Sequence, residues 1–477
     1  MKLRAKLRRT LPLLLALTLV APLAIAQSPT HDVSLYLTTS DRTNLLKLQP
    51  PIPFTTTPGA ATQTIDVDAA KTYQTIDGFG FALTSGSAEL LMHMDPAKRD
   101  ALLHELFTVT KDGTGDGIGV SYLRLTIGAS DMNASVYSYD DLAPNETDVP
   151  MAHFTLAPDK DTVIPIMKQI LAIDPKIKTL ASPWSAPLWM KTNDAAQGGV
   201  LLPKYFHAYA TYFVKYIEGM KAEGIPIDTM TIQNEPLNEK NTPSMLMLSP
   251  EQDMFIKDDL GPAFRRAHIK TGIVLYDHNL DHPLYPLAIL RDPAAAQYVA
   301  GSGFHLYGGT VDAMTEVHNA FPNKNIYFTE QSITQRDNDG PLHITRAVAD
   351  VMIGVSRNWS KNILLWNLAA DPNDGPHTDN GGCDSCSGAL TIDGDNVRRN
   401  VAFYTVAQLS KFVPPGSVRI GSNDLDTLPN VAFRTPDGKR VLVVSNTTGT
   451  TQTFNVHTGP HNFSTSLDAG SVGTYVW

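Results

Sequence analysis

The chain has 477 residues, of which 42% are hydrophobic and 18% charged, and its 38 Lys and Arg against 48 Asp and Glu give a formal charge of −10. This composition indicates a globular protein and excludes a disordered chain or a repeat array, and the length exceeds what one small core serves. Because no run of Lys or Arg follows the first residues, we expect no nucleic-acid partner.

The first 26 residues have the pattern of a cleavable export signal. Five basic residues lie within residues 2–9, an apolar stretch runs from Leu11 to Ala24, and the segment ends in Ala-Ile-Ala. The stretch is short for a membrane span and contains two prolines, so a retained anchor is the weaker alternative. We expect an exported protein, periplasmic or secreted, with no integral membrane association.

From about residue 75 to residue 412, short apolar runs alternate with stretches of helical periodicity. Eight such units in series favour an α/β fold of the (β/α)8 TIM-barrel type over an open doubly wound sheet. A Gly-x-Gly-x-x-Gly turn after a strand, which would indicate dinucleotide binding, is absent from the sequence. The predicted strands are Gln74–Leu83, Ser121–Ile127, Lys178–Pro183, Asp228–Asn234, Gly272–Asp277, Ser302–Tyr307, Asn325–Glu330 and Asn362–Leu368. The predicted helices are Ser87–Leu106, Val163–Ile173, Lys204–Ala222, Pro250–His268, Ala313–Ala320, Ile344–Arg357 and Arg399–Phe412.

After Val413-Pro414-Pro415-Gly416 the pattern changes to strand-like alternation with Gly, Asn and Asp turns. Residues 33–48 and 63–67 have the same character, so we expect N-terminal and C-terminal strands to form one accessory antiparallel β-sandwich. The predicted C-terminal strands are Asn430–Arg434, Arg440–Ser445, Thr451–His457 and Ser471–Trp477. The predicted domains are a signal peptide (1–26), N-terminal sandwich strands with a linker (27–74), the catalytic barrel (75–412) and the C-terminal sandwich (413–477).

Two carboxylates stand at the ends of predicted barrel strands, where barrel enzymes gather their active residues. Glu235 follows the fourth strand and Glu330 closes the seventh. Each could instead pair with an Arg in a structural salt bridge, but the two together suit glycosidic cleavage, in which one carboxylate attacks and the other handles protons. Strand ends also supply aromatic faces on which sugar rings pack, although each could simply fill the barrel: Trp184, Trp189, Tyr307 and Trp366.

Ordered motifs across nearly the whole mature chain resemble glycoside hydrolase family 30, which contains glucosylceramidase and microbial β-1,6-glucanases. Asn-Glu-Pro alone is common among barrel hydrolases, whereas the ordered set is specific. The similar segments are Ile76–Gly80, Leu123–Asp131, Tyr137–Asp140, Ala181–Lys191, Gln233–Pro236, Phe304–Tyr307, Thr329–Glu330 and Trp366–Ala369. Segments Asp277–Pro283 and Asp371–His377 resemble microbial members more than the animal lysosomal enzyme, which leaves the aglycone open.

The resemblance implies a retaining mechanism with Glu235 as acid/base and Glu330 as nucleophile. It implies that Arg124 keeps Glu330 ionised, and that Glu235 holds its proton in an apolar setting near another anion. By similarity Asn234 would bind the sugar 2-OH, and Asp131 and Trp184 the outer hydroxyls of a terminal glucose. His305, Tyr307 and Trp366 would line the same pocket; a loop-capping role for Asp131 and a structural role for His305 are the alternatives.

The sequence therefore predicts an exported retaining β-glycoside hydrolase acting on β-1,6-glucan, a glucosyl lipid or another β-glucoside. The alternatives are a xylanase or β-xylosidase of the same family, against which Asp131 argues, and a non-catalytic carbohydrate-binding barrel. We expect a monomer that needs no metal and no organic cofactor, because carboxylates and water suffice and the histidines show no ligand spacing.

The two cysteines, Cys383 and Cys386, lie three residues apart in a Gly/Ser-rich loop. In an exported chain a local disulfide is the favoured interpretation. A redox motif would need a thioredoxin-like strand and helix around it, and a zinc site would need further nearby ligands.

Overall fold

The computed structural model describes Met1 and residues 32–110, 115–335 and 340–477. The predicted export signal lies outside the described residues, Met1 apart. Within the described part of the chain, no helix is both long enough and apolar enough to cross a bilayer.

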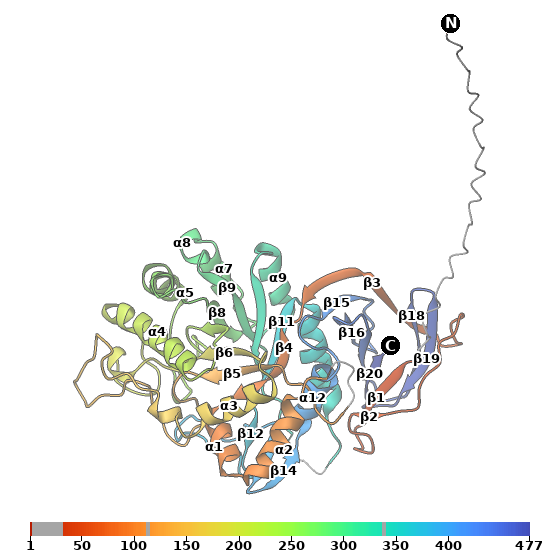
Figure 1. Ribbon diagram of the computed structural model, residues 1–477, viewed down its shortest axis with the longest axis horizontal. Helices are drawn as coiled ribbons and strands as arrows, with labels where there is room; N and C mark the ends of the chain where they lie inside the picture. The colour runs from red at the N-terminus through yellow and green to blue at the C-terminus, as the bar shows by residue number, and fades with distance from the viewer. Residues whose placement is uncertain (2–31, 111–114, 336–339) are drawn as a thin grey trace. The chain divides into compact units, whose positions relative to one another are not determined.

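Eight parallel strands form a closed barrel, as the alternating pattern predicts (Figure 1). Around the barrel the order is β10-β11-β4-β5-β6-β7-β8-β9, so the first and last strands of the series pair and close the ring. The strands are β4 (Gly78–Leu83), β5 (Tyr122–Thr126), β6 (Lys178–Ser182), β7 (Thr229–Thr231), β8 (Gly272–Asn279), β9 (Val299–His305), β10 (Asn325–Glu330) and β11 (Ser360–Asn367).

Helices follow the strands and bury their apolar sides in one large core with the outer faces of the barrel. They are α1 (Ser85–His93), α2 (Pro96–Phe107), α3 (Val163–Ile173), α4 (Phe206–Ala222), α5 (Ser249–Met254), α6 (Gly261–Arg266), α7 (Leu284–Leu290), α8 (Pro293–Ala296), α9 (Asp312–Ala320), α10 (Ile344–Arg346), α11 (Gly354–Arg357) and α12 (Val401–Ser410). Short 3-10 turns lie at η1 (Ala157–Asp159), η2 (Leu188–Met190) and η3 (Pro203–Tyr205).

Three predicted helices are interrupted in the structure, one by a helix start and two by π-helical segments. The expected helix Ser87–Leu106 is two helices, because the Asp95 side chain accepts hydrogen bonds from the backbone amides at the start of α2 and Pro96 occupies its first position. The expected helices Pro250–His268 and Ile344–Arg357 each contain a π-helical segment, η4 (Phe255–Leu260) and η5 (Ala347–Ile353).

Strands from both ends of the chain build the accessory β-domain, as expected. The sheet order is β19-β18-β3-β15-β16-β17-β20-β1-β2. The long strand β3 pairs at its start with β18 and further along with β15, so one sheet bends around its own apolar core. The strands are β1 (Ser34–Thr38), β2 (Lys47–Leu48), β3 (Gln63–Thr75), β15 (Val418–Ser422), β16 (Asn430–Arg434), β17 (Arg440–Ser445), β18 (Gln452–Thr458), β19 (His461–Leu467) and β20 (Val472–Val476).

Two of these strands, β15 and β19, and helices α7 and α8 are absent from the sequence prediction. The predicted strand Gln74–Leu83 is also wrong at its start, since Gln74 belongs to β3 and the barrel strand β4 begins at Gly78. A small sheet of β12 (Ala369–Ala370), β13 (Leu390–Asp393) and β14 (Asn396–Arg399) follows the last barrel strand.

Buried polar contacts join the β-domain to the barrel through α12. Gln408 Nε2 donates to Thr38 Oγ1 on β1 at 2.7 Å, and Thr474 Oγ1 on β20 donates to Gln408 Oε1 at 2.6 Å. A further contact comes from α11, where Arg357 Nη1 donates to the Asn430 carbonyl on β16 at 3.0 Å. Both chain ends of the β-domain are thus fixed against the same barrel helix.

Candidate active site

Alternation along the barrel strands determines which side chains meet in the barrel. One layer is a small buried cluster made of Tyr122, Leu180, Val274, Tyr327 and Leu364. Because every second strand residue faces the same side, the next inward layer lies two residues further along each strand. That layer brings together Arg124, Ser182, Thr231, Thr329 and Trp366, and it lies toward the carboxyl ends of the strands.

A bulge in β8 adds a carboxylate to this layer. Strict alternation from Val274 would place Tyr276 inside, but the pairing with β9 shifts between Tyr276 and His278, and Tyr276 and Asp277 have φ values of 71° and 63°. Such an extra residue re-aims the side chains around it. Tyr276 accordingly packs against Phe304 and Tyr285, and Asp277 turns into the barrel.

Asp277 is fully buried and accepts five side-chain hydrogen bonds. Arg124 Nη2, Thr231 Oγ1 and Ser182 Oγ donate to Oδ2 at 2.8, 2.7 and 3.1 Å, and His305 Nε2 and Thr329 Oγ1 donate to Oδ1 at 3.0 and 2.5 Å. Burial raises the pKa of Asp277, but Arg124 and His305 outweigh that effect and hold the pKa well below its usual range. Asp277 is therefore the buried anion around which the site is organised.

Arg124 connects this anion to the predicted catalytic residues. Its Nη1 donates to Glu330 Oε2, and its Nη2 donates to Asn234 Oδ1 at 2.7 Å as well as to Asp277. The guanidinium carbon lies 4.8 Å from the centroid of the Trp184 ring and 5.8 Å from that of Trp366. Charge pairing and aromatic contact together fix one guanidinium orientation.

The two predicted catalytic carboxylates face each other near a single imidazole. His305 Nδ1 lies 3.1 Å from Glu235 Oε1 and 3.9 Å from Glu330 Oε1. Asn238 Nδ2 donates to Glu235 Oε2 at 2.8 Å, and the Tyr307 hydroxyl donates to Glu330 Oε1 at 3.0 Å. Glu235 has the left-handed φ of 44°, an unfavourable conformation for a non-glycine residue of the kind that is frequent at active sites.

The pKa directions of these two carboxylates are the reverse of those expected from the sequence, which were a lowered pKa for Glu330 and a retained proton on Glu235. Burial raises the pKa of Glu235, but the neighbouring imidazoles of His278 and His305 outweigh it, so its pKa is lowered. Burial also raises the pKa of Glu330, and here His305 and Arg124 offset it only in part, so its pKa is raised. The expectation that Glu235 holds its proton in an apolar setting is thus wrong for the free enzyme, because two imidazoles surround that carboxylate.

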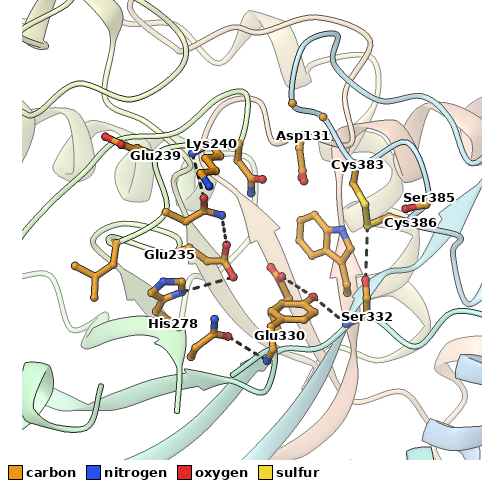
Figure 2. Close-up of a pocket in the computed structure, with 18 of the residues that line it drawn as sticks. Asp131, Glu235, Glu239, Lys240, His278, Glu330, Ser332, Cys383, Ser385 and Cys386 are labelled. Carbon is orange, nitrogen blue, oxygen red and sulfur yellow. Dashed lines mark hydrogen bonds and ion pairs between the residues drawn. A yellow bond between two sulfur atoms is a disulfide. The ribbon is translucent and has the colours of Figure 1, made fainter. Parts of the chain in front are cut away.

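A cavity of about 910 Å³ opens above the pair (Figure 2). Glu235 and His278 form one wall, Glu330 lies at the base, and the Cys383–Cys386 disulfide with Ser332 forms the opposite wall. The predicted disulfide is confirmed, and Cys386 packs in a cluster with Trp184, Trp366 and Met132.

Asp131 projects into this cavity (Figure 2). Its side chain is buried, and Oδ1 has no hydrogen-bond acceptor or donor opposite it among the described residues. Burial and the charges of Glu330 and Glu235 raise the pKa of Asp131 to about 8. A buried carboxyl group with a free oxygen can bind a ligand that carries hydroxyl groups.

The structure brings the predicted site residues together at two depths. Asp131, Glu235, Tyr307, Glu330 and Trp366 line the cavity. The predicted residues Arg124, Trp184, Asn234 and His305 are buried beside them, where they contact the lining residues. Trp189 lies elsewhere: its Nε1 donates to the Asp140 carboxylate at 3.1 Å, and its ring edges a separate cavity.

Sequence reasoning missed three residues of the site. Asp277 and His278 were predicted as a strand end and loop, and Asn238 was not singled out. An available signal was the abrupt change from the apolar run of the fifth strand to Asp277-His278-Asn279 at its carboxyl end, which is where barrel chemistry gathers. The histidines, expected to show no ligand arrangement, converge here: Glu235, His278 and His305 offer ligand atoms within 4.8 Å of one another.

Fold and site together define a barrel hydrolase with paired buried carboxylates, and comparison with known proteins gives its family. Residues 76–413 match the glycosyl hydrolase family 30 TIM-barrel domain, and residues 416–475 match the glycosyl hydrolase family 30 beta sandwich domain. The chain belongs to glycosyl hydrolase family 30, and it is a glycosyl hydrolase.

Similar proteins include glucanases and glucosylceramidases. The chain is 35% identical to an endo-1,6-beta-D-glucanase of Neurospora crassa, over 87% of this chain and 88% of the relative. It is 30% identical to the lysosomal acid glucosylceramidase of Mus musculus, over 85% of this chain and 82% of the relative. Among solved structures, an endo-beta1,6-glucanase matches with a TM-score of 0.84 and 38% identity, over 94% of this chain and 99% of that one.

Proposed function

We propose that this protein hydrolyses β-1,6-linked glucan by a retaining double displacement, with Glu330 as nucleophile and Glu235 as acid/base. The observation that carries the proposal is the pair of buried carboxylates at one cavity, both within reach of His305 Nδ1 at 3.1 and 3.9 Å. The linkage is supported by the names of the similar glucanases, one a curated relative and one a solved structure.

In the first step Glu330 attacks the anomeric carbon while the glycosidic C–O bond breaks. Arg124 and Tyr307 each donate a hydrogen bond to Glu330, so its two oxygens are held in one orientation before attack. Glu235 transfers a proton to the leaving oxygen, and His305, bonded to the same carboxylate oxygen, is the nearest group that can supply that proton. The products are a glycosyl ester on Glu330 and the released sugar hydroxyl.

In the second step water replaces Glu330 at the anomeric carbon. Glu235, now ionised, takes a proton from the attacking water, and the ester C–O bond breaks to return Glu330 as a carboxylate. Two displacements at one carbon restore the original β configuration. Asp131 lines the same cavity and its Oδ1 has no hydrogen-bond partner among the described residues, which suits it to accept a hydrogen bond from a hydroxyl of the bound glucose.

Replacement of the nucleophile tests the assignment directly. Glu330→Ala should abolish hydrolysis of an aryl β-glucoside, and added azide should restore turnover by attacking the vacated face, which gives the α-glucosyl azide. Glu239→Ala is the matched control, because Glu239 lines the rim of the same cavity but is exposed. Wild-type hydrolysis by Glu330→Ala, or a β-configured azide product, contradicts the proposal.

A substrate panel tests the linkage separately from the mechanism. Initial rates on pustulan, laminarin, xylan and glucosylceramide should be highest on pustulan, the β-1,6-linked glucan. Faster cleavage of glucosylceramide would assign the protein to the activity named for its mouse relative, and faster cleavage of xylan would support the xylanase alternative. Sugar binding without release of reducing ends would leave only a binding barrel.

We also propose that the protein is exported and acts as a monomer in the periplasm or outside the cell. The signal-like residues 1–26 and the local disulfide support export. N-terminal sequencing of protein from a producing cell should find the chain starting at Gln27, and sedimentation should give a single-chain mass. A chain that retains Met1 inside the cell contradicts export.

A further inference from the structure

Two histidines and one carboxylate converge on the acid/base side of the cavity. His278 Nδ1 lies 3.6 Å and His305 Nδ1 3.1 Å from Glu235 Oε1, and the three side chains are buried. Tetrahedral zinc with bonds of about 2.0–2.1 Å holds neighbouring ligand atoms about 3.3–3.4 Å apart. The two nitrogen–oxygen spacings are close to that separation, and the two imidazole nitrogens lie within 4.8 Å of each other, so the rings need only approach each other to complete a site for a small divalent cation.

His278 supplies an independent observation that points to a ligand. Only 7% of the residue is exposed, and Nδ1 has no hydrogen-bond partner among the described residues, because 3.6 Å to Glu235 is too long for one. A buried nitrogen without a partner is costly. The residue lines the cavity and points toward Glu235 (Figure 2), so a ligand can reach this nitrogen from solvent.

Neighbouring residues already hold two of the three ligands as a metal site requires. Asp277 Oδ1 binds His305 Nε2 at 3.0 Å, which leaves Nδ1 directed at Glu235. Asn238 Nδ2 binds Glu235 Oε2 at 2.8 Å, which leaves Oε1 facing the two imidazoles. A carboxylate behind a metal-binding histidine is the usual arrangement in zinc sites, where it fixes the ring orientation. The open cavity provides the fourth position for water.

We propose that Glu235, His278 and His305 form a binding site for Zn²⁺ or a similar borderline divalent cation, and that occupation of the site inhibits the enzyme. Two nitrogens and one oxygen favour Zn²⁺, Cu²⁺ or Co²⁺ over Ca²⁺ and Mg²⁺, which prefer oxygen ligands. The inhibition rests on the proposed role of Glu235, since a carboxylate bonded to zinc cannot exchange protons with the leaving oxygen. The binding itself does not depend on that role.

The test measures metal binding and activity on the same full-length preparations. Isothermal titration with Zn²⁺, and the visible absorption of tetrahedral Co²⁺, should show one site in the wild type. His278→Asn should weaken Zn²⁺ binding by about 100-fold and abolish the Co²⁺ spectrum. His282→Asn is the matched control: this histidine lies four residues on, its side chain is 58% exposed, and the change should leave binding unaltered.

A second variant covers the case in which His278→Asn does not fold, as judged by metal-free thermal unfolding. Glu235→Gln should also lose the tetrahedral Co²⁺ spectrum. Equal Zn²⁺ affinity in the wild type and in either folded variant, or no tetrahedral Co²⁺ band in the wild type, overturns the metal site even if glucan hydrolysis is confirmed. Binding at this site without inhibition of hydrolysis instead overturns the inhibition and, with it, the acid/base role of Glu235.

Discussion

The buried Asp277 offers a demanding test of how the site is held together. Asp277→Asn keeps the shape of the side chain but turns one of its two acceptor oxygens into a donor. At least two of its five donors then face an NH₂ group, and Arg124 and His305 lose their shared counter-charge. Removing one partner of a buried ion pair costs about 3–5 kcal/mol, so the free energy of unfolding should fall by that order.

Activity should fall as well, because Asp277 orients the two cations that contact the catalytic pair. A loss of about 3 kcal/mol in transition-state stabilisation corresponds to about a 100-fold lower kcat/KM. Denaturant unfolding and steady-state kinetics on a β-glucoside measure the two effects on one preparation. Asp281→Asn is the control, since this carboxylate is about half-exposed in the loop that follows β8 and its loss should change stability by less than about 0.5 kcal/mol.

The pH dependence of the unfolding free energy is a further test of Asp277→Asn. Burial lowers the pKa of His305, but Glu330, Asp277 and Glu235 outweigh it and raise the pKa to about 9. Its contribution to stability is therefore complete below its ordinary pKa of about 6.5 and is lost as pH rises toward 9. Asp277→Asn should flatten this decline. A variant with unchanged unfolding free energy, kcat/KM and pH slope would refute the reasoning.

Three other substitutions test separate parts of the site. Because the pKa of Asp131 is raised to about 8, the wild type should lose stability as pH rises from about 4 to 8. Asp131→Asn should remove that decline and, in denaturant unfolding at pH 8, stabilise the fold by about 2–4 kcal/mol. The same variant should have a higher KM. Tyr307→Phe removes a 3.0 Å hydrogen bond to Glu330 and should lower kcat about tenfold with little change in KM; an unchanged kcat contradicts this role. The buried Lys191 Nζ donates to three backbone carbonyls at 2.6, 3.2 and 2.8 Å. Lys191→Met should therefore lower the unfolding free energy by about 2–4 kcal/mol. A loss below about 1 kcal/mol would show that the carbonyls find other partners.

The barrel could be predicted from the sequence because parallel strands buried on both faces are continuous apolar runs. Strand β10 has the predicted bounds Asn325–Glu330, and helix α3 has the predicted bounds Val163–Ile173, whose apolar spacing is strongly helical. The π-helical segments η4 and η5 could not be predicted, because they arise from packing and leave the periodicity of the residues nearly unchanged.

That Glu235 and Glu330 meet at one cavity could be predicted for the same reason, since Glu330 ends an apolar strand and Glu235 follows one within a few residues. Asp277 could not, because its inward direction depends on a bulge that shifts the alternation by one residue. The direction of the Glu235 pKa shift could not be predicted from the sequence for a related reason. It is set by His278 and His305, which lie 43 and 70 positions further along the chain and come near only when the barrel closes.

The pairing of β1 with β20 has a consequence for synthesis. β1 is the earliest strand of its sheet; it can pair with β2 at once, but it cannot pair with β20 until nearly all of the chain has left the ribosome. The barrel has the same dependence, since β4 pairs with β11. Contacts so distant in sequence form slowly. The sheet of the β-domain and the ring of the barrel can therefore be completed only late in synthesis.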